Sequence, residues 1–394
     1  MTSPPPLPAA KAPSSAEPPE VSLIVNTYRK PRHLAIVLES IALQTGFDVP
    51  MELVVADDGS DDETADLVDR FASRVPFPVR FTSEAHDGFR LARVRNRGAV
   101  IARGATLLFL DGDSFLPPDH VAAHLARRRP GRAQLGDVAR LPEAISRDIT
   151  PATLAGLDLN GLVVADERRR LARRHRKARW QNLLKHPSKP RLAGGTFAIW
   201  RSDYLRINGS DERFRGWGQE DDDLGLRLRA AGVRLESILD RTFTYHVWHP
   251  TDPSATPRWR DGVNVPYFLR RGRLTRCRAG LETRPPTAIL WGLPADLEAT
   301  PLGRELACLL AGAPRAPARE ACEIEIALWP GDGRFTRRSE CRWLLVDEPP
   351  PPLPGGPRSP RTPPPGWWLR RGADRTDRVS VGDGTLADLL EQVG

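Results

Sequence analysis

Cysteine and long apolar runs are both scarce in this sequence of 394 residues. The four cysteines, at positions 277, 308, 322 and 341, contain no CxxC pair, which argues against a zinc site or a disulfide framework and predicts reduced thiols. No stretch approaches the ~20 apolar residues that a membrane span requires. Residues 1–19 lack the apolar core of a secretory signal. These absences predict a soluble protein that works in the cytoplasm or against the inner face of the cell membrane.

Lysine is also rare, and arginine supplies most of the positive charge behind the net charge of +8. Together with abundant Ala, Gly and Pro, this bias is typical of a GC-rich genome. The 39 prolines are clustered, which predicts a disordered Pro/Ala-rich tail at 1–19 and a Pro-rich linker at about 348–366. We expect one large domain at 20–275 and a C-terminal region of unknown role at 280–394.

Short apolar runs alternate with helical patterns over the first 118 residues. Strands are expected within 21–30, 51–62, 79–84 and 105–118, with helices within 31–45, 63–75 and 88–104. This order predicts an α/β protein with a doubly wound, mostly parallel sheet. Ligands of such sheets collect at the carboxyl ends of the strands, where two pairs of acids fall.

The first pair of candidate ligands is Asp111 and Asp113, separated by one glycine at a strand end. Two carboxylates at this spacing can both reach a divalent cation, and hard oxygen ligands favour Mg²⁺ or Mn²⁺. Asp and Gly are also ordinary turn residues, so the triplet alone is a weak signal and is more typical of a turn.

The second pair is Asp57 and Asp58, which end an earlier strand and suit hydrogen bonds to a nucleobase or ribose. Ser60 or Asp61 could simply cap the following helix. Arg95 lies in an arginine-rich helix that leads into the DxD strand, and such a helix can direct one arginine toward a phosphate-bearing site.

A run of four acids, Glu220 to Asp223, follows the segment "GWGQ". Acids at a helix N-terminus complement the helix dipole, but four exceed what that role needs. The preceding Trp217 offers an aromatic platform on which a sugar can stack. A carboxylate beside it could deprotonate an attacking hydroxyl.

The segment "YHVWHP" places His246 and His249 at a later strand end. A lone histidine is more often a structural residue, but two of them downstream of a DxD favour a metal ligand.

Residues 168–179 carry seven arginines and one lysine. This segment is either a solvated basic helix or a surface that attracts anionic lipid headgroups. Base-stacking aromatics are not interleaved with it, so no nucleic-acid partner is expected.

Several ordered motifs over about residues 20 to 250 resemble family 2 glycosyltransferases of the GT-A fold, of the chondroitin-polymerase-like and galactosyltransferase-like subgroup. The matching stretches are "VSLIVNTYRKPRHLAIVLESIALQT", "LVVADDGSDDET", "GFRLARVRNRGAVIARGATLLFLDGD" and "GGTFAIWRSDYLRINGSDERFRGWGQEDDDLGLRL". Many relatives have Pro-Thr-Tyr-Asn where this chain has "NTYR".

The resemblance implies an inverting, Mn²⁺- or Mg²⁺-dependent transfer from a nucleotide-sugar, usually UDP-linked, to a glycan or lipid-linked acceptor, in bacterial surface polysaccharide or lipopolysaccharide synthesis. Asp221 takes the position of the catalytic base, with Glu220 beside it. The implied donor contacts are Asn26, Thr27, Tyr28, Asp57, Asp58, Arg95, Asp111 and Asp113. The implied metal ligands are Asp111, Asp113 and His246, with His249 in reserve, and the implied acceptor contacts are Gly194, Gly195, Trp217, Glu220 and Asp222.

Two other functions compete with this interpretation. A nucleotidyltransferase would carry a Gly-rich basic loop after its first strand, and "NTYRKPRH" lacks those glycines. A non-catalytic glycan-binding relative would have lost the DxD or the Glu-Asp pair, and both are present. The donor sugar, the acceptor, the linkage and the number of transfers are not determined by the sequence.

Overall fold

The computed structural model describes residues 18–192, 195–251, 256, 258–269, 273–317, 320–329, 339–346, 366–370 and 390. The chain divides into two compact units, Met1–Val265 and Pro266–Gly394, slightly before the expected boundary at 275–280. Gly194 and most of the predicted tail and Pro-rich linker lie outside the described residues.

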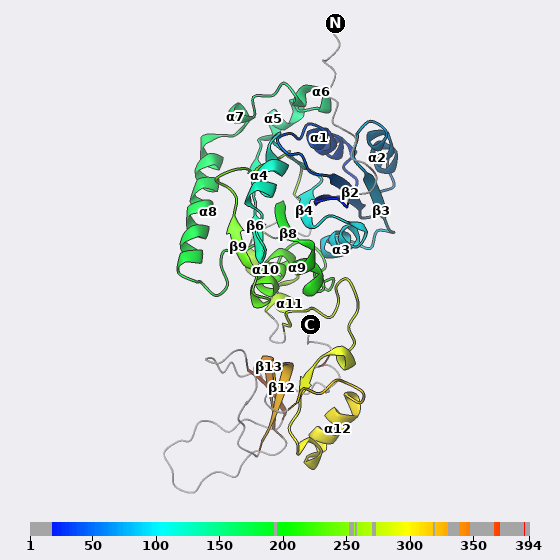
Figure 1. Ribbon diagram of the computed structural model, residues 1–394, viewed down its shortest axis with the longest axis vertical. Helices are drawn as coiled ribbons and strands as arrows, with labels where there is room; N and C mark the ends of the chain where they lie inside the picture. Colours follow the sequence, from blue (N-terminus) through cyan, green and yellow to red (C-terminus); the bar gives the residue numbers. More distant parts are fainter. Residues whose placement is uncertain are drawn as a thin grey trace. The chain divides into compact units, whose positions relative to one another are not determined.

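The first unit is built on a seven-stranded sheet (Figure 1). Its strands are β1 (Val21–Thr27), β2 (Met51–Asp57), β3 (Val79–Ser83), β4 (Thr106–Asp111), β6 (Arg132–Leu135), β8 (Thr196–Trp200) and β9 (Arg234–Ser237). They lie in the order β3-β2-β1-β4-β8-β6-β9, and only β8 runs antiparallel to its neighbours β4 and β6. The predicted α/β class with a mostly parallel sheet is therefore confirmed.

The helices between the first four strands cover both faces of the sheet. They are α1 (Pro31–Ala42), α2 (Thr64–Ala72) and α3 (Leu91–Ile101). Leu23 and Val25 of β1 belong to the same buried core as Leu34 of α1. Ile24 faces α3, where a Cβ added to Gly98 would meet its Cγ2 at 2.5 Å. Since successive side chains of a strand point to opposite faces, α1 and α3 lie on opposite sides of β1.

A second, three-stranded sheet brings the DxD strand end to the histidine segment. It consists of β5 (Ser114–Phe115), β7 (Val138–Arg140) and β10 (Thr244–His246), in the order β5-β10-β7. His246 pairs in register with Ser114 on one side and with Arg140 on the other. This pairing places a histidine next to residues more than 100 positions away in the sequence.

The remaining helices of the first unit lie mainly in its second half. They are α4 (His120–Arg127), α5 (Glu143–Asp148), α6 (Pro151–Leu154), α7 (Leu159–Leu162), α8 (Ala165–Leu183), α9 (Arg201–Arg206), α10 (Glu220–Ala230) and the 3₁₀ helix η1 (Trp259–Asp261), with α11 (Val265–Phe268) at the boundary. Within the described part of the chain, none of the helices combines the length and the hydropathy that crossing a bilayer would take.

Helix α10 contains the acid run and is anchored in the core. Leu224 and Leu228 are fully buried, and Gly232 just past the helix end has a φ of +84°, as a glycine C-cap requires. Asp223 is also fully buried, where it accepts a hydrogen bond from Arg227 at 2.7 Å. The Arg227 guanidinium donates further to the backbone carbonyl of Gly209.

The second unit has a four-stranded sheet of its own. Its elements are 3₁₀ helices η2 (Pro286–Ala288) and η3 (Leu297–Ala299), helix α12 (Pro301–Leu309), and strands β11 (Trp291–Gly292), β12 (Cys322–Trp329), β13 (Ser339–Val346) and β14 (Gly366–Arg370). Trp291 and Trp343 meet edge to face in its core, with ring centroids 5.2 Å apart. The four cysteines are thiols and form no disulfide with one another, as the sequence predicted.

Replacing Asp223 with asparagine should lower the free energy of unfolding of the first unit by about 3–5 kcal/mol, because it leaves the Arg227 charge buried without its counter-ion. The matched control is Asp166→Asn, which breaks an exposed aspartate–arginine pair on α8 whose aspartate side chain is 87% exposed. It should change stability by less than about 1 kcal/mol. Urea unfolding followed by circular dichroism measures both. A loss no larger at Asp223 than at Asp166 would contradict a structural role for the buried pair.

Candidate active site

Asp57, at the end of β2, is committed to the fold of its own loop. Its buried carboxylate accepts hydrogen bonds from the backbone N–H groups of Gly59 and Ser60 and from the hydroxyls of Ser60 and Ser83. With four donors from the protein, Asp57 shapes the strand-end loop. Its predicted contact with a nucleotide stays a prediction.

Asp58 lies beside a pair of stacked rings. The rings of Tyr28 and His86 stack nearly parallel, with centroids 4.0 Å apart. The His86 Nδ1 atom lies 3.0 Å from the backbone oxygen of Asp58 and 3.3 Å from its carboxylate. Partial burial raises the pKa of Asp58. The predicted donor residues Tyr28 and Asp58 are thus brought together, and sequence analysis missed His86.

The last two residues of β1 carry polar atoms without partners. Asn26 donates to the carbonyl of Leu110, and its Nδ2 also lies 3.5 Å from Asp111 Oδ1. Its own side-chain oxygen and the Thr27 hydroxyl are buried and have no hydrogen-bond partner among the described residues. Unpaired buried polar atoms are costly, so their position at the strand-end edge fits a site completed by a ligand.

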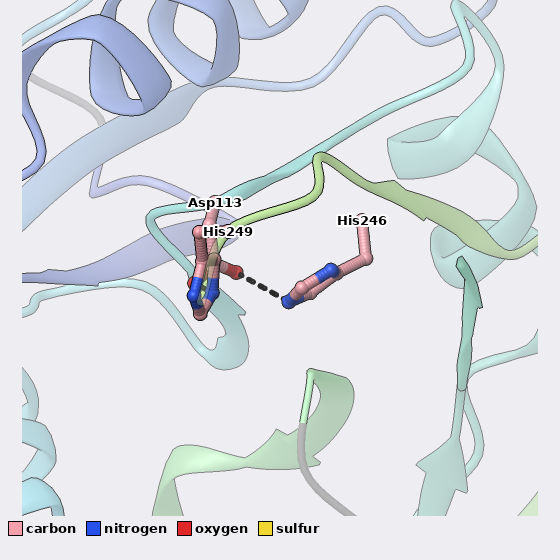
Figure 2. Close-up of side chains that lie close together, drawn as sticks. All are labelled: Asp113, His246 and His249. Atoms are coloured by element: carbon pink, nitrogen blue, oxygen red, sulfur yellow. Dashed lines mark hydrogen bonds and ion pairs between the residues drawn. The ribbon is translucent and has the colours of Figure 1, made fainter. Parts of the chain in front are cut away.

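Asp113, His246 and His249 form a cluster that could hold a metal ion (Figure 2). Their ligand atoms all lie within 4.8 Å of one another. Among the described residues, no other group of three or more His, Cys, Asp or Glu side chains has this geometry. His249 Nε2 is 3.0 Å from Asp113 Oδ2, and His246 Nε2 is 3.6 Å from Asp113 Oδ1. One carboxylate and two imidazoles suit Mn²⁺ and related divalent cations, so these residues fit the expected metal. Both histidine candidates belong to the cluster.

Lys30 lies against the same atoms. Its ammonium is 2.9 Å from Asp113 Oδ2 and 2.9 Å from His249 Nε2. A metal ligated by those two atoms would therefore require Lys30 to give up its contacts. Lys30 was not among the predicted site residues, and its only signal in the sequence is a cation three positions after the end of β1.

The charges around the cluster differ from one residue to the next. Burial disfavours ionisation of Asp113, but the hydrogen bond from His249 and the charge of Lys30 hold its pKa well below the usual range. The hydrogen bond to Asp113 raises the pKa of His249. Burial lowers the pKa of His246. The cluster therefore keeps one ionised carboxylate, and His246 is held toward the neutral form that a metal requires.

Arg95 connects the DxD strand to the acid run. Its guanidinium is 2% exposed and lies 2.5 Å from Asp221 Oδ1 and 3.6 Å from Asp111 Oδ1. Burial alone would lower its pKa, but the charges of Asp221 and Asp111 raise it, so the arginine stays charged. Asp111 lies outside the metal cluster and beside Arg95, and burial raises its pKa to about 6. Its predicted role as a metal ligand stays a prediction.

Glu220 is the first residue of α10 and is almost fully buried. Burial, reinforced by the neighbouring charge of Asp221, raises its pKa to about 8. Its Oε2 atom has no hydrogen-bond partner among the described residues. At neutral pH Glu220 therefore carries a proton and can donate a hydrogen bond, whereas it is poorly suited to accept a proton.

A cavity of about 860 Å³ joins these groups. Asp111 and His246 line it from the DxD side, and Glu220, Asp221 and Asp222 line it from the start of α10. Trp217 and Gly195 belong to the same lining, and the Trp217 side chain is about half exposed. Among the described residues, the structure thus brings the predicted acceptor contacts and the predicted base into one cavity.

Asp222 forms an ion pair, and Gly195 adopts a backbone conformation that favours glycine. Asp222 pairs with Arg191 at 3.1 Å. Gly195 has a φ of +100°, and its carbonyl accepts a hydrogen bond from the Asp111 backbone. A Cβ at this position would lie 2.6 Å from Val138, so a glycine is needed there.

Two models of glycosyltransferase families match parts of the first unit. Residues 22–140 match the family model described as glycosyl transferase family 2, and residues 174–250 match the model described as the N-terminal domain of galactosyltransferase. These two stretches are therefore similar to family 2 glycosyltransferases and to galactosyltransferases, the resemblance that the motifs predicted.

Two curated relatives are similar to more than half of the chain. A validoxylamine A glucosyltransferase from Streptomyces hygroscopicus subsp. limoneus is 30% identical over 234 residues, which cover 55% of this chain and 49% of the relative. A chondroitin synthase from Escherichia coli is 26% identical over 274 residues, which cover 64% of this chain and 39% of the relative. The chain thus spans half of the length of these relatives or less.

A solved structure of a mannosyltransferase from Pyrobaculum calidifontis in complex with GDP-Man and Mn²⁺ is 20% identical to this chain. It superposes with a TM-score of 0.41, covering 61% of this chain and 60% of the other.

Replacing Glu220 with glutamine should flatten the pH dependence of stability between about pH 5 and 8. An ordinary glutamate ionises near 4.5, whereas folded Glu220 ionises near 8, so the unfolded chain binds fewer protons in this window. Stability then falls as the pH rises, by at most about 1.4 kcal/mol per pH unit for one proton. Urea unfolding at a series of pH values measures this slope. Glu63→Gln, at an exposed site, is the control. Equal slopes in all three proteins would contradict the raised pKa.

Proposed function

We propose that the chain transfers a sugar from a nucleotide-sugar donor, UDP-linked, to a hydroxyl of a glycan or lipid-linked acceptor, with inversion at the anomeric carbon. The observation that carries this proposal is the single cavity lined by Asp111, His246 and Asp221. It joins groups suited to a nucleotide diphosphate with a carboxylate suited to an acceptor hydroxyl.

The donor end of the proposed site runs from Tyr28, Asp58 and His86 to the Asp113 cluster. The stacked rings and the Asp58 carboxylate suit a nucleobase and its ribose, and the unpaired Asn26 and Thr27 atoms lie at the same strand end. A divalent cation bound by Asp113, His246 and His249 would neutralise charge on the departing diphosphate.

At the acceptor end, Asp221 acts as the general base. As the acceptor oxygen forms its bond to the anomeric carbon, the bond to the phosphate oxygen breaks and its electron pair stays on the nucleotide diphosphate. The proton of the acceptor hydroxyl passes to Asp221. Arg95 donates a hydrogen bond to Asp221 Oδ1, and the transferred proton is accepted by the other carboxylate oxygen, Oδ2. Protonated Glu220 donates a hydrogen bond to an acceptor oxygen.

No covalent intermediate is required by this scheme. Attack from the face opposite the leaving diphosphate inverts the anomeric centre in one step. The matched curated relatives include polysaccharide synthases of bacteria, which supports a role in the assembly of a bacterial surface polysaccharide or lipopolysaccharide.

Replacing Asp221 with asparagine should lower the rate of sugar transfer by about 10²–10⁴-fold, because it removes the general base. A panel of nucleotide-sugars and acceptors, assayed for nucleotide release with Mn²⁺ and with a chelator, identifies the donor and measures the rate. Chelation should abolish turnover. The control Asp66→Asn, at an exposed position of α2, should match the unmodified protein. Metal-independent release that survives Asp221→Asn would overturn the mechanism.

We also propose that the outward line of α8 rests on an anionic membrane. Arg169, Arg173, Arg176, Trp180 and Leu184 recur at helical spacing and are exposed. Trp180 and Leu184 are 63% and 75% exposed, and Leu183 beside them is 69% exposed. Arginines followed by a tryptophan and leucines suit a headgroup layer, where each basic residue adds about 1 kcal/mol.

The double change Arg173→Gln with Arg176→Gln should weaken binding to vesicles containing phosphatidylglycerol by about tenfold or more. Trp180→Ala with Leu184→Ala should weaken it at high salt as well, because these contacts are apolar. Vesicle sedimentation measures both, with Arg70→Gln as the control at an exposed site of α2. Equal binding to neutral phosphatidylcholine vesicles, or no binding to either kind, would contradict a membrane role.

A further inference from the structure

The inner side of α8 faces the same cavity as the proposed base. Arg174 and Lys177 of α8 line the cavity, and Ala178 and Gln181 on the same side of the helix line it too. Lys189 and Arg191, from the segment after α8, and Arg140, at the end of β7, complete a basic wall. The wall therefore stands in one cavity with Glu220, Asp221 and Asp222.

Two of these five cations are neutralised by the protein. Arg174 pairs with the buried carboxylate of Asp137 at 2.8 Å, which Arg170 shares at 2.9 Å. Arg191 pairs with Asp222 at 3.1 Å. The acids Asp111 and Asp221, which also line the cavity, pair with the buried Arg95.

Three cations remain. Arg140, Lys177 and Lys189 line the cavity and form no ion pair with any residue that the structure describes. The protonated state of Glu220 adds no compensating charge at neutral pH. The cavity thus has an excess of positive charge on the wall formed by α8 and by the segment that follows it.

The three cations do not all lie at the donor end. Arg140 pairs in register with His246, so it lies next to the metal cluster and can serve a donor diphosphate. Lys189 belongs to the segment that α10 holds, because Arg229 donates to the carbonyl of Pro190 and Arg191 pairs with Asp222. Lys177 lies one turn of α8 beyond Arg174. Lys189 therefore lies close to α10, where the acceptor hydroxyl would meet Asp221, and Lys177 lines the same cavity.

We infer that the acceptor carries an anionic group, a phosphate or a carboxylate, bound by Lys177 and Lys189 while its hydroxyl lies at Asp221. This inference rests on the proposed transfer reaction and names its acceptor class. Ammonium groups suit both anions through charge-assisted hydrogen bonds.

The test compares the same sugars in three forms. Glucose, galactose and N-acetylglucosamine are each presented as the neutral methyl glycoside and as the 1-phosphate, with the uronate form of each hexose as the carboxylate arm. Nucleotide release is followed at saturating donor and Mn²⁺. An anionic form should be the better acceptor. The phosphate and carboxylate arms then distinguish the two sources of charge.

The variant Lys177→Gln with Lys189→Gln should raise the KM for the anionic acceptor by about tenfold or more, with the donor KM and kcat little changed. Lys177→Arg with Lys189→Arg should restore most of the affinity because it restores the charge. The control Lys185→Gln removes an exposed lysine that does not line the cavity. An unchanged acceptor KM, or a raised donor KM in its place, would overturn the inference.

A binding experiment separates this inference from the transfer reaction. Ligand-observed NMR with glucose 1-phosphate, glucuronate and methyl glucoside, in the presence of UDP and Mn²⁺, needs no turnover. Binding of an anionic form that the double glutamine variant loses supports the site even where no transfer is seen. Equal binding of methyl glucoside and the anions overturns the inference and leaves the proposed transfer standing, whereas absence of nucleotide release with every acceptor counts against the transfer itself.

Discussion

The buried charge of Arg95 is the constraint on which the candidate site depends. A guanidinium removed from water needs carboxylates around it, and Arg95 finds them at the end of β4, in Asp111, and at the start of α10, in Asp221. These two segments are distant in sequence, and the one ion-pair network fixes both against the α3 helix that carries the arginine. The guanidinium carbon of Arg95 also lies 5.3 Å from the ring centroid of Phe197 in β8, so a side chain of the central sheet packs against it. The spacing between the proposed donor end and the proposed base is therefore set by the core of the protein.

The four acids at the start of α10 differ in how their negative charge is compensated. Asp223 is fully buried and neutralises Arg227, Asp221 pairs with Arg95, Glu220 is kept protonated by burial, and Asp222 faces the cavity with Arg191. Four neighbouring acids thus occupy four electrostatic environments, and the helix dipole accounts for none of their differences. A protein can place so many carboxylates together because two are compensated by buried arginines, one by an exposed arginine and one by a proton.

Much of the fold could be predicted because its signals are local. Apolar strands alternate with helices from β1 to β4, and the acids that close the strands must meet at one edge of a parallel sheet. The part that could not be predicted depends on pairing across long distances. The register of β10 against β5 and β7 sets His246 beside Ser114 and Arg140, and no local pattern carries that register. Asp57 was expected at a nucleotide because it ends a strand, but only the folded loop reveals that Ser60 and Ser83 occupy its oxygens.

Side chains of helix α8 have different surroundings: Arg174 and Lys177 line the cavity, whereas Trp180 and Leu183 are exposed and do not line it. An α-helix with its side chains is only about 10–12 Å across. A molecule held in the plane of a bilayer against the outer face would thus lie one helix diameter from the cavity. The rate of encounter with such an acceptor would depend on the number of acceptor molecules per unit area of membrane. Dilution of the bulk solution would leave that surface density unchanged. The geometry of a single helix can in this way convert a search through a volume into a search along a plane.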